Sequence, residues 1–340
     1  MKSTSLQNAM DRHGLTDKDL LDEVLSAAPK ACAVIVTGSL AAGFGNEHSD
    51  IDLVCIVPDG QYSRLPIMVY RDGAKIDCEY WLLPDLIAAM DRISAADLQQ
   101  DVGHFQEWKK LTRALQLLIK LSVAYSLQVT DSVKPLWDYV HSADFKHRIR
   151  TWWSLEALRL MAAARHALPS QPRFANNLYS EAVLAALSSQ ATEQSLLFGK
   201  KWLGEKLRQS CDETGLALYH LALELPCGDE AQVRERCLEL DRMLSHSSVL
   251  EPWLYRADGL CWWLTPAARL NKFADCVLLW QGKVGYEFPR KHAAESWSCD
   301  RPLQMGAADG LDDNATTLLF KDGLVWPGLA FSSATAGVAR

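Results

Sequence analysis

The sequence lacks several features that would mark a secreted, disulfide-bonded or membrane protein. Its nine cysteines are odd in number and form no C-x-x-C pair, which argues against a disulfide framework or a structural zinc site and favours reduced thiols. The first residues, MKSTSLQNAMDRHG, contain no apolar core typical of a signal peptide. No segment approaches the run of about 18–20 apolar residues that a membrane-spanning helix needs. We therefore expect a cytoplasmic protein without a membrane partner.

Positive charge is also scarce. The chain has 35 Lys and Arg against 42 Asp and Glu, which gives a formal net charge of −7. A surface that binds nucleic acid must neutralise phosphates with basic residues, so this balance argues against a nucleic-acid partner. Internal repeats and low-complexity tracts are absent as well, and the sequence leaves the oligomeric state open.

Length and pattern predict more than one domain. The chain has 340 residues, whereas a domain usually holds about 100–200. Strand-like apolar runs lie before Pro84, and the pattern that follows is helical as far as about residue 250. The predicted domains are residues 1–98, the helical residues 99–250, and a C-terminal extension, residues 251–340, to which the sequence assigns no role.

The first domain reads as a small sheet with helices. A stripe of leucine and valine predicts a helix over residues 15–27. The turn-forming pair Asp72-Gly73 predicts a hairpin between two of the strand-like runs. The predicted strands are CAVIVT (32–37), IDLVCIV (51–57), PIMVYR (66–71) and AKIDCEYWL (74–82).

Two acids open the second apolar run. Alternate residues of a strand face the same side about 6.5 Å apart, so Asp50 and Asp52 share one face. Two carboxylates at that distance repel by roughly 2–3 kcal/mol at an effective dielectric constant of about 20. A divalent cation reverses the sign of this interaction, and Mg²⁺ is often held by one or two carboxylates together with substrate phosphates. The alternative is that Asp50 caps a turn and Asp52 faces solvent.

A glycine-serine pair leaves the preceding strand. Gly38 allows backbone N–H groups to turn toward an anion, and the Ser39 hydroxyl adds a donor. If a helix begins at Leu40, its positive end faces the same anion. Gly-Ser after a strand, then ten residues, then Asp-x-Asp at the start of another strand is far more specific than either motif alone.

A third acid is expected on the strand KIDCEYW. Asp77 and Glu79 lie on one face of it, and Ile76, Cys78 and Tyr80 lie on the other. Only one of the two acids need act as a ligand or base, and the other is then a surface acid.

Together these residues resemble the nucleotidyltransferase superfamily with the DNA polymerase β-like fold. Its pattern is Gly-Ser, a spacer, Asp-h-[Asp/Glu]-h and a later strand with h-[Asp/Glu]-h, where h is apolar. VTGSLAAGFGNEHSDIDLVCI and KIDCEYW match this pattern over roughly residues 30–82. The resemblance implies an α+β protein, in which a polymerase-β-like domain with a small mixed sheet precedes an all-α domain and a mixed C-terminal segment.

The helical part resembles the partner domain of aminoglycoside-type and related small-molecule nucleotidyltransferases. Its segment GKKWLGEK matches the Lys-Trp element that those enzymes place over the nucleotide, and either lysine would reach a phosphate as a point charge. The alternative is a solvated helix start with Trp202 packed inside. The implied roles are nucleotide binding for Gly38, Ser39, Lys200 and Lys201, metal binding for Asp50, Asp52 and Asp77, and catalysis for Asp50, Asp52, Asp77 and Glu79.

The resemblance implies transfer of a nucleoside monophosphate, with ATP the expected donor, to a hydroxyl of a small molecule or peptide. Mg²⁺ is the implied cofactor, and pyrophosphate is released. We expect the acceptor to lie near aromatic side chains of the helical part, for which Trp152, Trp153, Trp202 and Tyr179 are the candidates. Alternatives with the same fold are a protein adenylyltransferase and a nucleotide-binding regulator without turnover.

Overall fold

A computed structural model describes residues 2–60, 67–193, 202–224, 228–254, 256–289, 297–298, 302–303 and 311–331. The chain divides into two compact units that alternate along the sequence. The N-terminal unit comprises residues 1–96, 110–150 and 191–212, and the C-terminal unit comprises residues 97–109, 151–190 and 213–340. Helices α6 (Phe105–Ser122) and α8 (Ala143–Ala167) contribute residues to both. The three functional domains expected from the sequence stay a prediction.

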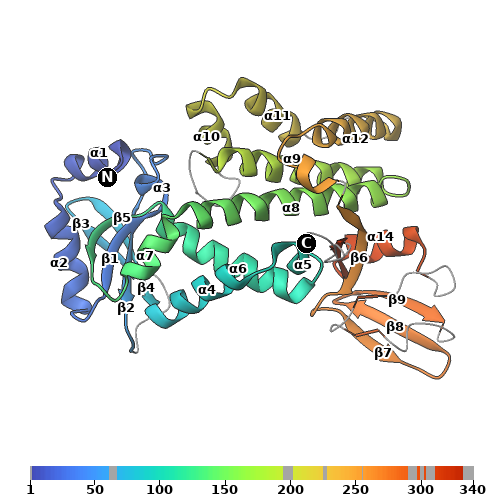
Figure 1. Cartoon of the computed structure of the whole chain (residues 1–340), viewed down its shortest axis with the longest axis horizontal. Coiled ribbons are helices and arrows are strands. Elements are labelled where there is room, and N and C mark those ends of the chain that lie inside the picture. The colour runs from blue at the N-terminus through green and yellow to red at the C-terminus, as the bar shows by residue number, and fades with distance from the viewer. Residues whose placement is uncertain are drawn as a thin grey trace, which may run out of the picture. The chain divides into compact units, whose positions relative to one another are not determined.

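The N-terminal unit is built on a five-stranded mixed sheet with the order β3-β4-β2-β1-β5 (Figure 1). Strands β2 and β4 are parallel, and every other neighbouring pair is antiparallel. The register places Asp52 of β2 between Thr37 of β1 and Asp77 of β4. The strands are β1 (Ala33–Thr37), β2 (Ile51–Val57), β3 (Ile67–Arg71), β4 (Ala74–Leu82) and β5 (Tyr125–Val129).

Two helices bury one face of this sheet. Leu6 of α1 (Thr4–Arg12) and Leu20 of α2 (Asp17–Ala27) are fully buried in a cluster that includes Ile51 and Ile76. A capping box, in which Thr16 and Asp19 bond each other's backbone N–H groups, starts α2. Because strand side chains alternate, burying Ile51 and Ile76 on this face directs Asp52 and Asp77 to the opposite face.

Most predicted elements of the N-terminal unit are confirmed, including the hairpin at Asp72-Gly73 that joins β3 to β4. One prediction is wrong: the segment around Tyr125 was expected to continue a helix, but α6 ends at Ser122 and β5 follows. Strand β5 pairs with β1, whose edge would otherwise stay open. The remaining helices of this unit are α3 (Gly38–Ala41), α4 (Leu83–Ala95), α7 (Lys134–Val140) and α10 (Leu203–Gln209).

The C-terminal unit combines helices with two small antiparallel sheets. A hairpin around Gly282 joins β8 to β9, and Asp313–Lys321 forms helix α14. The predicted α+β class is therefore confirmed. The elements are α5 (Leu98–Asp101), α9 (Pro172–Ala191), α11 (Glu213–Leu223), α12 (Glu230–Ser245), α13 (Glu251–Leu254), α14 (Asp313–Lys321), β6 (Ala257–Leu264), β7 (Arg269–Lys272), β8 (Cys276–Gln281), β9 (Val284–Pro289) and β10 (Val325–Phe331).

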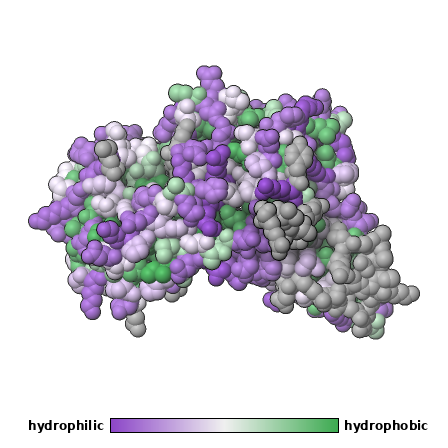
Figure 2. All heavy atoms as spheres, in the orientation of Figure 1, coloured by the Kyte–Doolittle hydropathy of each residue, from purple (hydrophilic) through white to green (hydrophobic). Residues whose placement is uncertain are grey.

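The described surface is largely hydrophilic on one face of the molecule. On the face seen in Figure 2, hydrophilic residues cover most of the described surface, and hydrophobic residues form separate patches between them. None of the described helices has both the length and the apolar character needed to span a bilayer.

Candidate active site

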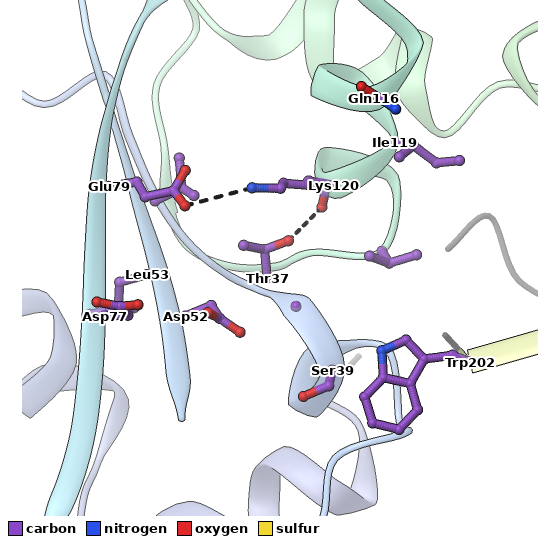
Figure 3. Close-up of a pocket in the computed structure, with 13 residues that line it drawn as sticks. Thr37, Ser39, Asp52, Leu53, Asp77, Glu79, Gln116, Ile119, Lys120 and Trp202 are labelled. Atoms are coloured by element: carbon purple, nitrogen blue, oxygen red, sulfur yellow. Dashed lines mark hydrogen bonds and ion pairs between the residues drawn. The ribbon is translucent and has the colours of Figure 1, made fainter. Parts of the chain in front are cut away.

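A pocket of about 530 Å³ opens on the polar face of the five-stranded sheet. All its lining residues belong to the N-terminal unit, and they come from β1, α3, β2, β4 and α6 and from Val123 and Trp202. Figure 3 shows the acids of β2 and β4 facing side chains of α6 across the pocket. The lining residues are Thr37, Gly38, Ser39, Asp52, Leu53, Val54, Asp77, Glu79, Gln116, Ile119, Lys120, Val123 and Trp202.

Asp52 and Asp77 lie side by side in this pocket. They are directly paired in the parallel register of β2 and β4, so both carboxylates leave the same face of the sheet. Burial raises the pKa of Asp52 to about 6, and the charge of Asp77 adds to the shift. The pair therefore holds excess negative charge that a bound cation would neutralise.

Gly38 brings the backbone close to this pair. Its φ of +73° lies in the left-handed region, and a Cβ built there would lie 1.9 Å from Oδ2 of Asp52. Both observations require glycine at this position. Thr37, just before it, is buried and donates its hydroxyl to the carbonyl oxygen of Lys120 at 2.7 Å, which ties the turn to α6. The turn and the two carboxylates thus share one wall of the pocket.

Asp50 lies just before β2 and is not among the residues that line the pocket. Its Oδ2 accepts a hydrogen bond from Nζ of Lys75 on β4. That hydrogen bond raises the pKa of Lys75. The structure thus brings Asp52 and Asp77 together, while Asp50 is bound to a lysine that the sequence analysis did not single out.

Glu79 lines the pocket farther along β4 and has two partners of its own. Its Oε2 accepts a hydrogen bond from Nε1 of Trp81 at 2.8 Å, and its Oε1 lies 3.6 Å from Nζ of Lys120 (Figure 3). The Lys120 ammonium also lies 5.3 Å from the centre of the Trp81 ring, a cation–π distance. These contacts distinguish Glu79 from Asp77. Among the described residues, Asp77 takes part in no ion pair.

Lys120 is the functional candidate that sequence reasoning missed. It is the only lysine or arginine among the described residues that line the pocket. Within α6 it lies one turn from Gln116, which lines the same pocket, so the two belong to one helical face. A single lysine in the apolar run LQLLIKLSV is the available signal, but only the packing of α6 against the sheet reveals where it points.

The other predicted site residues differ in their position relative to the pocket. Lys200 and Lys201 lie outside the described residues. Ser39 lines the pocket, as does Trp202, whose ring stacks on Phe44 with centroids 6.1 Å apart and an interplanar angle of 14°. The remaining aromatic candidates are buried in the C-terminal unit and line no part of this pocket; they are Trp152, Trp153 and Tyr179.

The donor set suits a hard dication. Asp52 and Asp77 supply carboxylate oxygens, the ligands that Mg²⁺ prefers, and a bound cation would offset the charge of Asp77 that adds to burial in raising the pKa of Asp52. Among the described residues, no three acidic, histidine or cysteine side chains converge closely enough to enclose an ion in this conformation. Asp50, the other acid of the Asp-x-Asp motif, accepts a hydrogen bond from Lys75 instead.

Comparison with known proteins identifies the class of the domain that carries this pocket. Residues 18–120 match the family described as "Nucleotidyltransferase domain". This part of the chain therefore belongs to the nucleotidyltransferase superfamily, and a domain of this family supports a general nucleotidyl transfer activity.

Among solved structures, the chain is similar to a nucleotidyltransferase-like protein from Exiguobacterium sibiricum, with 12% sequence identity and a TM-score of 0.41. That similarity covers 71% of this chain and 79% of the other. No curated protein matches the chain.

Proposed function

We propose that this protein transfers a nucleoside monophosphate from a nucleoside triphosphate to a hydroxyl group of a small molecule or peptide and releases pyrophosphate. ATP is the proposed donor. One observation carries the proposal: the paired carboxylates of Asp52 and Asp77 face a pocket whose wall includes the Gly38-Ser39 turn. A triphosphate and a dication need this combination, because the turn offers backbone and hydroxyl donors and the carboxylates hold the metal.

The reaction is a displacement at the α-phosphorus. The acceptor oxygen forms a bond to that phosphorus, the bond to the bridging oxygen breaks, and pyrophosphate leaves with the electron pair. Gly38 and Ser39 hold the triphosphate, and Asp50, Asp52 and Asp77 are the proposed ligands of Mg²⁺. When bound, Mg²⁺ supplies neutralisation of the charge on the phosphate oxygens. Most of the rate enhancement then comes from positioning and electrostatics.

Asp77 is the better candidate for the general base, the carboxylate that accepts the proton of the attacking hydroxyl. It lies beside Asp52, whereas Glu79 is bound to Trp81 and Lys120. Both carboxylate oxygens of Glu79 are thus already engaged by other side chains. We assign Glu79 and Lys120 instead to binding of the acceptor substrate. Glu79 can accept a hydrogen bond from its polar groups, and Lys120 can donate one. Lys200 and Lys201 stay proposed phosphate contacts.

Two alternatives use the same pocket. A protein adenylyltransferase would accept a side-chain hydroxyl of another protein, and a regulator would bind the nucleotide without turnover. The presence of all the proposed acids favours an active enzyme over the regulator.

The test combines nucleotide binding with a screen for pyrophosphate release. ATP titrations with and without Mg²⁺ measure binding, and incubation with panels of hydroxyl compounds, peptides and proteins measures transfer. We expect Asp52→Ala to reduce transfer at least about 10³-fold, because it removes a group that stabilises charge in the transition state. Transfer by this variant at the rate of the unmodified protein would refute the assignment of Asp52.

Glycine variants test the phosphate turn separately. Gly38→Ala should abolish ATP binding, because its methyl group would occupy the space next to Asp52. Gly14→Ala is the matched control: Gly14 also has a positive φ, +63°, but nothing lies within 4 Å of its added Cβ. Both variants carry the same kind of backbone strain, so equal ATP binding by the two would contradict the role of the turn.

A further inference from the structure

The contact between Lys75 and Asp50 is built into the sheet. Ile51 of β2 pairs with Ile76 of β4, so the residues just before them, Asp50 and Lys75, lie opposite each other at the entrance of the two strands. The side chains are 31% and 36% exposed, so both groups remain within reach of ions from solvent. The Lys75 ammonium donates to the carboxylate of Asp50.

The lysines and acids of this face form an ordered arrangement. Lys75 binds the outer acid at one end, Asp50, and Lys120 binds the acid at the other end, Glu79. Between them lie Asp52 and Asp77, and no ion pair within the described part of the chain reaches either one. The negative charge of Asp52 and Asp77 is therefore available to a cation. Asp50, which would complete a three-carboxylate site, is held by Lys75.

We propose that Lys75 is a positioning residue that holds the Asp50 carboxylate until a divalent cation at Asp52 and Asp77 takes the place of the ammonium. This inference rests on the proposed function, because it assumes that the cation binds there. A partly exposed ion pair contributes little to stability, so a dication with two carboxylates already in place can displace it. Lys75 thereby sets the metal affinity and limits carboxylate repulsion in the metal-free protein.

The first experiment measures metal affinity without activity. Mn²⁺ alone is titrated into the full chain, and free Mn²⁺ is followed by electron paramagnetic resonance. Removal of the competing ammonium in Lys75→Gln should tighten Mn²⁺ binding about fivefold, and Lys75→Met should do the same. Lys75→Arg keeps the charge and should bind as the unmodified protein does. Lys30→Gln makes the same charge change at an exposed position of the same unit and should have no effect.

The second experiment follows the ammonium itself. Acetylation of individual lysines by an activated ester is quantified by mass spectrometry, with and without saturating Mn²⁺. We expect Mn²⁺ to raise the labelling rate of Lys75 severalfold and to leave Lys30 unchanged. In Asp50→Asn, Lys75 should label fast without the metal, and Mn²⁺ should add little. A merely structural role for Lys75 would produce none of these differences.

The outcomes separate the inference from the function on which it rests. If the unmodified protein binds Mn²⁺ but neither Lys75→Gln nor Lys75→Met binds it more tightly, or if Mn²⁺ leaves the labelling of Lys75 unchanged, the inference is wrong and the proposed function survives. If neither the unmodified protein nor any variant binds Mn²⁺ in the presence or absence of ATP, the metal site fails and the inference fails with it.

Discussion

At the scale of single residues, Asp52 is the residue of the proposed site that most destabilises the metal-free protein. Its carboxylate is pressed against Gly38, beside Asp77 and largely out of water. Burial raises the pKa of Asp52 from 3.8 to about 6. The folded protein therefore prefers the protonated form of this side chain. The contribution of protonated Asp52 to the free energy of unfolding is complete below pH 3.8 and is lost as the pH rises through about 6.

Asp52→Asn should therefore stabilise the metal-free protein at neutral pH. The amide keeps the shape of the side chain but carries no charge, so we expect the free energy of unfolding at pH 7.5 to rise by about 1–3 kcal/mol. Urea unfolding at pH 4 and pH 7.5 measures the change. The difference between variant and parent should shrink at pH 4. Asp59→Asn, at an exposed position of the same unit, is the control and should change stability little. A lower stability of Asp52→Asn at pH 7.5 would contradict this account.

At the scale of elements, the first helix supports the phosphate turn from outside the matched family region. Helix α1 precedes residue 18, where the family match begins. Ser3 donates its hydroxyl to the carbonyl oxygen of Leu40, and Ser5 donates to that of Gly43 at 3.2 Å. Both carbonyls belong to the segment directly after Gly38-Ser39, so α1 holds the back of the turn in place.

Ser3→Ala should weaken this support. Ser3 is also the N-cap of α1 and accepts a hydrogen bond from the backbone of Leu6. We expect a loss of about 1–2 kcal/mol in the free energy of unfolding, together with weaker ATP binding. Thermal unfolding and ATP titration measure the two effects. Ser26→Ala serves as the control, because the Ser26 hydroxyl bonds only the nearby Glu23 carbonyl at an exposed position. An ATP affinity unchanged by Ser3→Ala would limit α1 to a structural role.

At the scale of the whole molecule, distant parts of the sequence meet in the C-terminal unit. Arg159 of α8 is buried and bonds Glu156 at 2.5 and 2.9 Å. It also donates to the carbonyl oxygen of Pro327 at 3.2 Å, 168 residues away, and lies 4.9 Å from the centre of the Trp326 ring. Trp108 donates to the same glutamate at 2.9 Å. The network joins α6, α8 and β10.

Glu156→Gln should therefore be strongly destabilising. It leaves the buried Arg159 charge without its carboxylate, which costs about 3–5 kcal/mol. Denaturant unfolding, followed by tryptophan fluorescence, measures the loss. Glu205→Gln breaks a partly exposed pair with Arg208 and should cost less than about 1 kcal/mol. Similar losses in the two variants would show that the buried network contributes no more than a surface pair.

Much of the fold was predictable because local signals agreed with tertiary ones. Periodicity and turn chemistry placed the strands that carry the acids and the hairpin at Asp72-Gly73. Strand β5 was missed, because the apolar pattern of α6 continues into it and only the open edge of β1 draws Tyr125 into the sheet. The acids of the pocket were predicted because the spacing of their motif is visible in the sequence. Lys75 and Lys120 belong to no such motif, so the sequence did not indicate them.

The sequence alone determined the α+β class, the positions of strands β1 to β4 along the chain and the candidate acids, because alternation and glycine requirements act over a few residues. The tertiary structure alone decided which acids stand together. The parallel register sets Asp77 beside Asp52 and Lys75 beside Asp50, and the packing of α6 brings Lys120 to Glu79. Charges interact through space over a few ångströms, so partners far apart in sequence acquire their roles only when strands and helices come together.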